Sequence, residues 1–496
     1  MIAENLYNAG SLFKKRFQSA LFSGKLNNPA GYLALAGLGL GLGILITQLG
    51  LNISIIALGG ILGIPVVFIC MFNQQFGVAF MLLVAFFVQF IAKYNDAPIG
   101  TSLDALLLIS CFGILIRQIL HKNWSFAKDP TSNWLLAWVY FNIFQVLNPA
   151  AESKLAWMYT VRSVAVLNIL YFVACYAFNS LDRIKFMLKW VLGLASITAL
   201  YAMKQEFIGF SAAEKSWLYA DPERFQLFFQ WGRMRIFSLF NDPMTFGVMM
   251  TYMGIFCFIM ATAPMVWWKK FLLIVMGIIM LWTTALTGTR TCYILIPIGF
   301  VYFAMMTLTR NVLIGIAVFT VLGSVLILKS TSNPMIYRIQ SAFRPSEDPS
   351  VLIRYYNQKR IRPYIYSHPI GSGLGSTGLW ARRFTPDSFL AKFAHDSYYV
   401  RLAVEVGWIG LALYMMFLFT AIRRGIYYYV RVKDPTIKKL YLALITSLFI
   451  LAVANYPQEA IDQLPTSLVV YIFIAAVVRL KDFDPYYQSI SPTLRA

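Results

Sequence analysis

The stretch "FAHDSYYVRLAVEVGWIG" (residues 393–410) places a histidine where a polar segment meets an apolar run. His395 is one of only three histidines among the 496 residues. A histidine side chain takes up and releases a proton near neutral pH, which suits a general base. The adjacent Asp396 could orient the imidazole ring or cap the helix that follows. We therefore treat His395 as the candidate catalytic base.

Two arginines stand at similar boundaries. Arg290 in "LTGTRTCYILIP" follows a Thr-Gly-Thr sequence that predicts a tight turn between two apolar helices. A cation at this depth is costly unless it is paired or faces water, which favours a function over a side chain that reaches out to lipid headgroups. Arg354 lies in "SVLIRYYNQKRIRPYIYSHPIGSGLGSTG", where residues 351–366 have the spacing of a helix on the membrane interface. Convergent arginines are typical of phosphate-binding sites.

A glycine-rich loop ends the same stretch. Its glycines are Gly371, Gly373, Gly375 and Gly378. The letters "GLGSTG" match a dinucleotide-binding fingerprint, but no strand–helix–strand unit surrounds them, so we reject that function. Glycines let backbone N–H groups approach an anion, or let a loop turn tightly. Farther along, Arg401 and Glu405 are four residues apart and are predicted to form a structural ion pair.

Long apolar segments must position these residues. Hydrophobic residues make up 59% of the chain, charged residues 13%, and the mean hydropathy is +0.65. A soluble protein of this length could not bury so much apolar surface. The apolar runs have the length of helices that cross a bilayer, whereas β-barrel strands would be short and alternating. The sequence predicts an all-α polytopic membrane protein with about 12–14 transmembrane helices.

The first two candidate spans meet at a tight turn near Gly50, so they could form one re-entrant pair. The candidate spans are residues 30–49, 52–72, 75–92, 102–120, 133–148, 161–178, 184–205, 242–262, 268–286, 291–308, 311–328, 397–421, 438–455 and 465–479.

Charges in the short loops orient these spans. With the basic N-terminal tail in the cytoplasm, the loops on its side each carry Lys or Arg, and the loop 422–439 carries six. The opposite loops "KYNDAPIG", "NPAAESK" and "NYPQEAIDQLP" are nearly neutral. Because cytoplasmic loops are enriched in Lys and Arg, both termini are predicted to be cytoplasmic.

This topology divides the chain into alternating membrane and extramembrane parts. They are a basic cytoplasmic tail (1–29), an N-terminal transmembrane bundle (30–205), an extracytoplasmic segment (206–240), central transmembrane helices (241–329), a large extracytoplasmic catalytic loop (330–396), C-terminal transmembrane helices (397–480) and a cytoplasmic tail (481–496).

The large loop at 330–396 is basic. It contains nine Lys or Arg residues and four acidic residues, which gives a net charge of +5. Long loops cross a membrane with little regard to their charge, so this excess is not explained by orientation. A surface against lipid phosphates is one explanation; an anionic substrate is the other, and we prefer it. No acidic cluster in the outer segments has the spacing of a divalent-cation site, so arginines would neutralise phosphates alone.

Four stretches, in order, resemble the motifs of the O-antigen ligase and polymerase superfamily. "RMRIFSLFNDPMTFG" is similar to its Arg-x-x-Gly-x-Phe-x-x-Pro-Asn segment, and "TGTR" to its Ser-Arg span start. "RYY…SHPIGSGLGSTG" is similar to Arg-x-x-x-Trp…Pro-x-x-Gly-x-Gly, and "HDSYYVRLAVEVGWIGL" to His-Asn-x-x-Leu…Glu-x-Gly-x-x-Gly. The resemblance runs from about residue 230 to about residue 480. The chain departs from the family at Asp396 and Met244, where Asn is usual, and at Thr289, where Ser is usual.

The resemblance implies a membrane glycosyltransferase of the GT-C type, with no metal and no other cofactor. It would move a glycan from undecaprenyl diphosphate to a hydroxyl of a glycan, a lipid A core or another acceptor. It would act among membrane lipids at the periplasmic face of the bacterial inner membrane, with no nucleic-acid partner. Arg290 and Arg354 would bind the diphosphate, and His395 would be the general base on the acceptor.

The resemblance also implies a set of residues that shape the substrate site. These are Arg235, Arg360, Gly371, Gly373, Gly375 and Asp396. A ligase and a polysaccharide polymerase share this chemistry and differ only in the acceptor, so both remain open. A flippase or transporter of lipid-linked sugars is the non-enzyme alternative. Transporters tend to show internal repeats and charges at mid-membrane depth, whereas here the charges gather at one interface.

Overall fold

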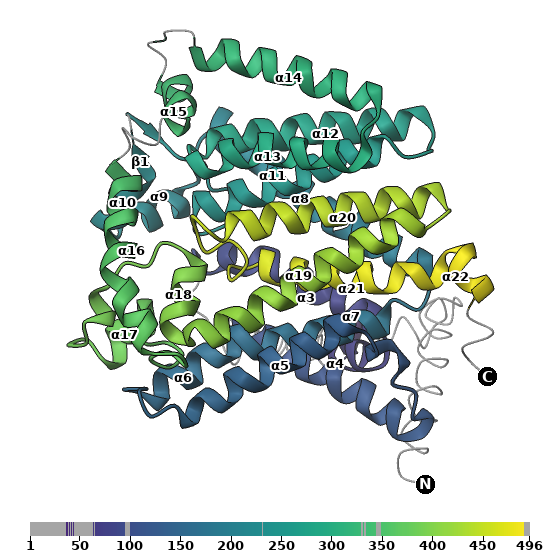
Figure 1. The fold of residues 1–496 in the computed structure, drawn as a ribbon, viewed down its shortest axis with the longest axis horizontal. Helices are drawn as coiled ribbons and strands as arrows, with labels where there is room; N and C mark the ends of the chain where they lie inside the picture. Colours follow the sequence, from purple (N-terminus) through teal and green to yellow (C-terminus); the bar gives the residue numbers. More distant parts are fainter. Residues whose placement is uncertain are drawn as a thin grey trace.

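The computed structural model describes residues 65–94, 100–230, 232–328, 334–343 and 349–490, together with Thr331 and isolated positions between residues 36 and 63. Over this part of the chain the fold is helical apart from one two-stranded antiparallel hairpin (Figure 1). The expected spans 30–49 and 52–72, and the question of a re-entrant pair, fall largely outside the described residues.

The helices follow one another with short connections. The first group is α3 (Gln74–Ile91), α4 (Gly100–His121), α5 (Pro130–Phe144), α6 (Lys154–Val161), α7 (Leu170–Ala177) and α8 (Leu181–Phe207). The segment after α8 contains α9 (Ala212–Tyr219), α10 (Pro222–Phe228), β1 (Phe229–Gln230) and β2 (Arg233–Met234). The central group is α11 (Pro243–Ala261), α12 (Trp267–Leu286), α13 (Arg290–Thr307) and α14 (Arg310–Leu328).

The remaining helices form the large loop and the last membrane group. The large loop contains α15 (Pro334–Ala342), α16 (Pro349–Ser367) and α17 (Gly378–Phe384). The last group is α18 (Tyr398–Glu405), α19 (Gly407–Arg431), α20 (Pro435–Ala454), α21 (Thr466–Arg479) and α22 (Pro485–Ile490).

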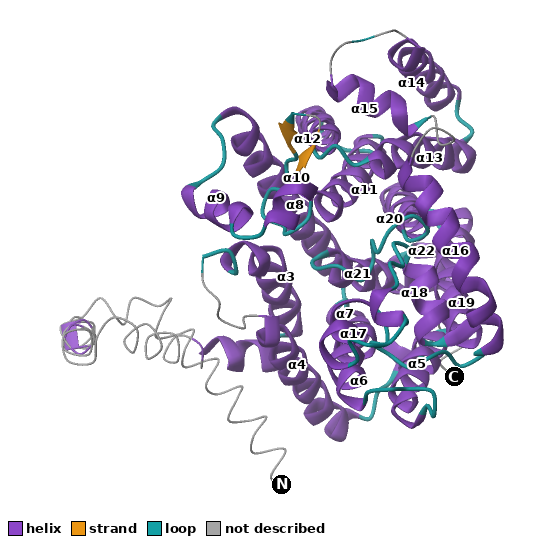
Figure 2. Ribbon diagram, turned by 90° about the vertical axis from the view of Figure 1, so that its left-hand side faces the viewer, coloured by secondary structure: helices purple, strands orange, loops and turns teal. Residues whose placement is uncertain are grey.

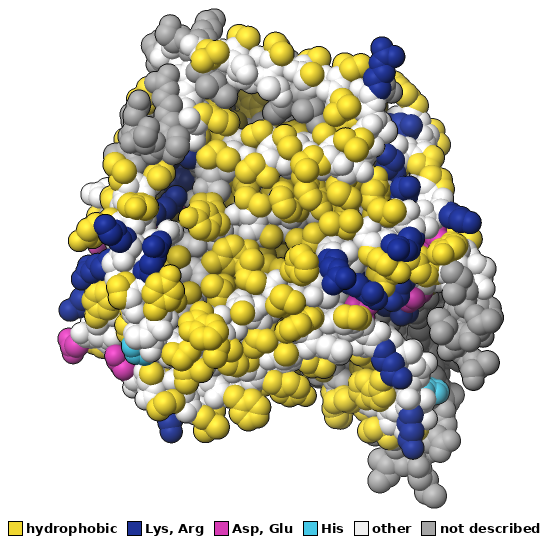
Figure 3. All heavy atoms as spheres, viewed as in Figure 1, with side chains coloured by type: hydrophobic (Ala, Val, Ile, Leu, Met, Phe, Trp, Pro, Cys, Tyr) yellow, Lys and Arg dark blue, Asp and Glu magenta, His cyan; other side chains and the backbone are white. Residues whose placement is uncertain are grey.

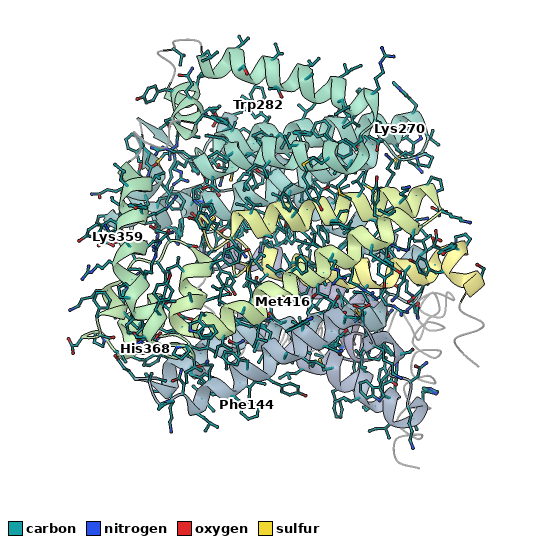
Figure 4. The ribbon with its side chains drawn as sticks, viewed as in Figure 1. Phe144, Lys270, Trp282, Lys359, His368 and Met416 are labelled. Carbon is teal, nitrogen blue, oxygen red and sulfur yellow. The ribbon has the colours of Figure 1, made fainter. Side chains whose placement is uncertain are left out.

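Nine helical segments of the described chain are long and apolar enough to cross a membrane. Figure 3 shows hydrophobic side chains gathered in a broad band across the middle of the molecule, with Lys and Arg toward both ends. Exposed apolar side chains such as Phe144, Trp282 and Met416, labelled in Figure 4, fit a surface that faces lipid. These features confirm an all-α polytopic membrane protein.

The core lies where α11, α20 and α21 pack together, and almost every residue of α11 and α21 is buried. A helix that is apolar on all sides belongs in such a position. Glycines allow the closest contact between α11 and α12: a Cβ on Gly254 would lie 2.9 Å from the Leu281 side chain, and one on Gly277 would lie 3.2 Å from the Gly254 carbonyl oxygen. Small residues at such crossings let helix backbones approach within a membrane.

Two predicted elements differ from those observed. The expected span 397–421 is two helices, because the chain breaks after α18 and α19 then continues to Arg431. Most of the expected loop 422–439 is therefore helical, and only residues 432–434 connect α19 to α20. By contrast, the helix expected at 351–366 is confirmed as α16, with Pro363 inside it near its end.

Candidate active site

The two ends of the helix bundle differ in what they carry. The α16 end, at the left of Figure 1, bears α9, α10, the hairpin, α16 and α17. The opposite α22 end carries the connections from α4 to α5, from α11 to α12 and from α19 to α20. Figure 2 views the α16 end directly and shows the hairpin beside α12 and α16 beside α18. In Figure 4, Lys359 and His368 mark the α16 end, and Lys270 marks the other.

The turn between α12 and α13 binds two arginine side chains. Arg235 donates from Nε to the Thr287 carbonyl oxygen at 2.8 Å and from Nη2 to Thr289 Oγ1 at 2.9 Å. Arg338 of α15 donates from Nε to the Gly288 carbonyl oxygen. Gly288 has φ +62°, and a Cβ there would lie 3.1 Å from Arg338 Nε, so a larger residue would displace that arginine. The turn expected from the sequence thus holds arginines from two other segments.

Arg290 is the first residue of α13 and follows the same turn. A cation is unfavourable at this position, because a helix N-terminus already presents unpaired N–H groups and a partial positive charge. The same features favour a bound anion. An anion in front of α13 would therefore be stabilised by both Arg290 and the helix end.

A cavity of about 860 Å³ opens in front of this helix end. Arginines from four segments line it, namely Arg235, Arg290, Arg338 and Arg354, and none of its described lining residues is acidic. Ile294, Leu295 and Ile298 of α13 form an apolar wall. Burial lowers the pKa of the Arg235 guanidinium, so an anion in the cavity would stabilise its charged form. We call this space the arginine cavity.

Asp396 connects the arginine cavity to His395. Its Oδ2 lies 3.7 Å from Arg354 Nε, and its φ of +46° puts the backbone in the left-handed region. Ser397, not Asp396, caps α18, because the Ser397 side chain accepts from the Val400 N–H. Asp396 therefore does not cap the helix, and it is not the partner of the imidazole ring. It pairs with Arg354 instead.

The imidazole ring of His395 faces Glu459 in the connection between α20 and α21. Nδ1 of His395 lies 3.3 Å from Glu459 Oε1. Gln458, the residue before Glu459, lines the arginine cavity. The structure therefore brings His395 to the margin of the arginine cavity, through its neighbour Asp396 and its partner Glu459.

Arg401 forms the predicted ion pair with Glu405, at 3.3 Å. It also contacts Asp462 at 2.8 Å and Glu459 at 3.3 Å. One guanidinium thus contacts three carboxylates, which satisfies most of its donors in a largely buried setting. The pair is confirmed, and it belongs to a larger cluster behind His395.

Sequence reasoning missed Arg338, Glu459 and Asp462. Glu459 and Asp462 stand in the short loop "NYPQEAIDQLP", where no motif or spacing marks them as site residues. Arg338 is one of nine basic residues in the large loop, and no spacing set it apart. The basic excess of that loop was the one signal that could have pointed to Arg338.

Arg360 and the glycines do not line the arginine cavity. Arg360 lies over the ring of Phe389, 4.8 Å from its centroid. It follows Arg354 by six residues, and 3.6 residues per turn place it on a different face of α16. The N–H groups of Gly371 and Gly373 donate to the carbonyl oxygens of His368 and Glu405.

Positive φ angles and close packing explain the glycine loop. A Cβ on Gly373 would lie 2.6 Å from Ala151 Cβ, and one on Gly375 would lie 2.5 Å from Thr160 Oγ1. A Cβ on Gly371 would lie 2.5 Å from the Gly407 nitrogen, at the break between α18 and α19. The loop therefore fastens α6 to the α18–α19 break, which fixes the direction of the segment that carries His395.

Gly407→Ala is expected to destabilise the protein strongly. Gly407 has φ +71°, and its Cβ would lie 2.0 Å from the Pro369 carbonyl oxygen. The left-handed backbone alone costs about 1–3 kcal/mol, and the clash adds to it. Gly232→Ala is the matched control, because Gly232 has φ +74° but nothing lies within 4 Å of its Cβ position. Thermal unfolding in detergent measures both; equal shifts would show that the contact with Pro369 contributes nothing.

A second cavity, of about 440 Å³, lies at the α22 end. Arg117, Arg183 and Arg479 are among its lining residues. Arg479 is paired there with Asp482, and Arg117 donates to the Phe72 carbonyl oxygen. His395 and the four arginines of the arginine cavity are not part of it.

The comparison with protein families gives a match to the O-antigen ligase family over residues 275–415. A comparison with curated proteins gives no match. The matched segment covers a little over a quarter of the chain and includes Arg290, Arg338, Arg354 and His395. Together with the helical membrane fold described above, this match confirms the likeness drawn from the motifs: residues 275–415 are similar to the O-antigen ligase family.

Proposed function

We propose that the protein is a metal-independent, inverting glycosyltransferase of the O-antigen ligase type. Its donor would be a glycan on undecaprenyl diphosphate, and its acceptor a hydroxyl group at the extracytoplasmic side of the inner membrane. Both termini would then be cytoplasmic and the α16 end would face the periplasm. The observation that carries the proposal is the arginine cavity, where four guanidinium groups stand beside an apolar wall.

The cavity suits a lipid diphosphate in both charge and polarity. Guanidinium groups bind phosphate oxygens through paired N–H donors. The apolar wall of Ile294 and Ile298 would contact the first part of the polyprenyl chain. A soluble anion has no apolar part that could contact these side chains, so the apolar wall supports a lipid-linked donor.

The reaction would be a single displacement at the anomeric carbon. The acceptor oxygen forms a bond to that carbon while the bond to the diphosphate oxygen breaks, and the electron pair leaves with the lipid diphosphate. His395 Nε2 takes the acceptor hydroxyl proton. Charge grows on the departing oxygen, and preorganised guanidinium groups stabilise it more in the transition state than in the ground state. Attack opposite the leaving group inverts the configuration of the sugar.

Purified protein in proteoliposomes would test the proposal. A radiolabelled oligosaccharide on undecaprenyl diphosphate is supplied with a lipid A core acceptor, and both products are measured. We expect one lipid diphosphate released for each glycan transferred, an inverted linkage by NMR, and unchanged transfer in EDTA. Extension of one lipid-linked glycan by another, without use of the core, would identify a polymerase. Movement of the glycolipid across the bilayer with no bond cleavage would contradict the enzyme and support a flippase.

A further inference from the structure

The charged groups behind His395 form one connected cluster. Glu459 contacts both the His395 ring and the Arg401 guanidinium, each at 3.3 Å. Asp462 accepts from the same Arg401 nitrogen as Glu459, Nη1, and Glu405 accepts from Nε. Thr377 donates from Oγ1 to Glu405 Oε1 at 2.6 Å, which ties the cluster to the loop before α17.

The two nitrogens of the His395 ring have different surroundings. Nδ1 faces the carboxylate of Glu459. Nε2 faces Gly378, where an added Cβ would lie 3.4 Å from Nε2 and 4.0 Å from Cε1, with no other described residue within 4 Å. Gly378 therefore leaves open the space that a substrate hydroxyl needs in front of Nε2. The φ of Gly378 is +69°, which also disfavours a side chain there.

We propose that Glu459 is the positioning residue of the catalytic histidine. Its Oε1 lies 3.3 Å from Nδ1 and accepts no hydrogen bond from the described residues, so it is placed to take the Nδ1–H of His395 in the substrate complex. That bond directs the Nε2 lone pair to the acceptor hydroxyl over Gly378. This inference rests on the proposed function. When His395 takes the acceptor proton at Nε2, the ring becomes an imidazolium, and Glu459 stabilises that charge. A hydrogen bond at one ring nitrogen sets the tautomer and thus the role of the other.

Arg401 keeps Glu459 in place and balances its charge, and Asp462 contacts the same guanidinium. Burial raises the pKa of the Glu459 carboxyl, whereas Arg401 and His395 oppose that rise. The other charged groups nearby are Glu405 on α18 and the Asp396–Arg354 pair that joins the loop to α16.

The pH dependence of transfer by Glu459→Gln tests the inference. The amide oxygen of Gln can still accept the Nδ1–H, but it does not balance an imidazolium. We expect kcat to fall about 10–100-fold with little change in the KM for the donor. The acid limb of the pH profile should move to lower pH, because the protonated ring loses its counter-charge while Arg401 remains beside residue 459. Glu459→Asp should retain most of the activity and the wild-type acid limb.

Asp462→Asn is the matched control. It removes a carboxylate from Arg401 but does not touch His395, so the acid limb should stay in place even if the protein is less stable. A wild-type kcat and pH profile for Glu459→Gln would overturn the inference. Equal shifts in Glu459→Gln and Asp462→Asn would overturn it too, since they would reflect only the net charge of the cluster.

Gly378→Ala tests the same geometry if Glu459→Gln does not fold. Its methyl group would occupy the space before Nε2, so the KM for the acceptor should rise while the KM for the donor stays constant. An unchanged acceptor KM would contradict the assignment of Nε2 as the face toward the acceptor. Failure of the proposed function itself looks different, because the wild-type protein would then transfer no glycan. If the wild type is active and His395→Ala retains full transfer, the catalytic role of His395 is wrong. If His395→Ala is inactive and Glu459→Gln behaves as wild type, only the role of Glu459 is wrong.

Discussion

Replacing His395 with alanine is expected to reduce the rate of glycan transfer by about 10²–10⁴-fold, the usual contribution of a general base. Among the residues that the structure describes, the ring is the one titratable group that contacts both the cluster of Arg401 and the open space at Gly378. Binding of the donor should persist, because His395 is not among the residues that line the arginine cavity. The measurement is transfer in proteoliposomes together with donor affinity. Added imidazole should restore part of the rate, since it can enter the space left by the ring.

His368→Ala is the matched control for this experiment. His368 lies at the same end of the bundle, but its Nδ1 is within 3.0 Å of the Tyr364 carbonyl oxygen and its ring stacks on Tyr364. We expect near wild-type transfer from it. Equal losses in both histidine variants, or full activity in His395→Ala, would contradict a catalytic His395.

Arg290→Ala is expected to reduce kcat by about 10²–10³-fold, the effect of removing one preorganised donor from a developing oxyanion. It should also weaken donor binding, because Arg290 adds its charge to the N–H groups at the start of α13. Arg290→Lys should recover part of the loss, since lysine keeps the charge and loses the forked geometry. Steady-state kinetics with varied donor concentration would separate the two effects.

Arg360→Ala is the control for Arg290→Ala. Arg360 carries the same charge at the same end of the bundle, but it stacks on Phe389 and does not line the arginine cavity. Its replacement should leave the kinetics almost unchanged. If Arg360→Ala lost as much activity as Arg290→Ala, general attraction of the donor to a basic surface would explain both results.

The parts of the site that could be predicted are those marked by local pattern. Arg290 was recognisable because a Thr-Gly-Thr turn and an apolar run flank it, and the structure places it at the start of α13. The helix that carries Arg354 was recognisable from its mixed apolar and basic periodicity. A scarce histidine at a polar–apolar boundary marked His395. In each case the sequence pattern that marks the residue lies within a few positions of the residue itself.

The parts that could not be predicted depend on contacts between distant segments. Glu459 lies 64 residues after His395 along the chain, and only tertiary packing brings the two together. The break between α18 and α19 lies in an apolar sequence that reads as one span. It is fixed by Gly407 against the carbonyl oxygen of Pro369, a contact across the glycine loop. The same packing explains why glycine stands at residues 371, 373 and 375, where a side chain would meet neighbouring segments.

The most direct measurement of the central claim is a cryo-electron microscopy structure of the protein with undecaprenyl diphosphate bound. We predict diphosphate density among Arg235, Arg290, Arg338 and Arg354, with the lipid chain against Ile294 and Ile298 of α13. Diphosphate density in the other cavity, beside Arg117 and Arg183 at the α22 end, would contradict it. So would a diphosphate at the α16 end that none of the four arginines contacts.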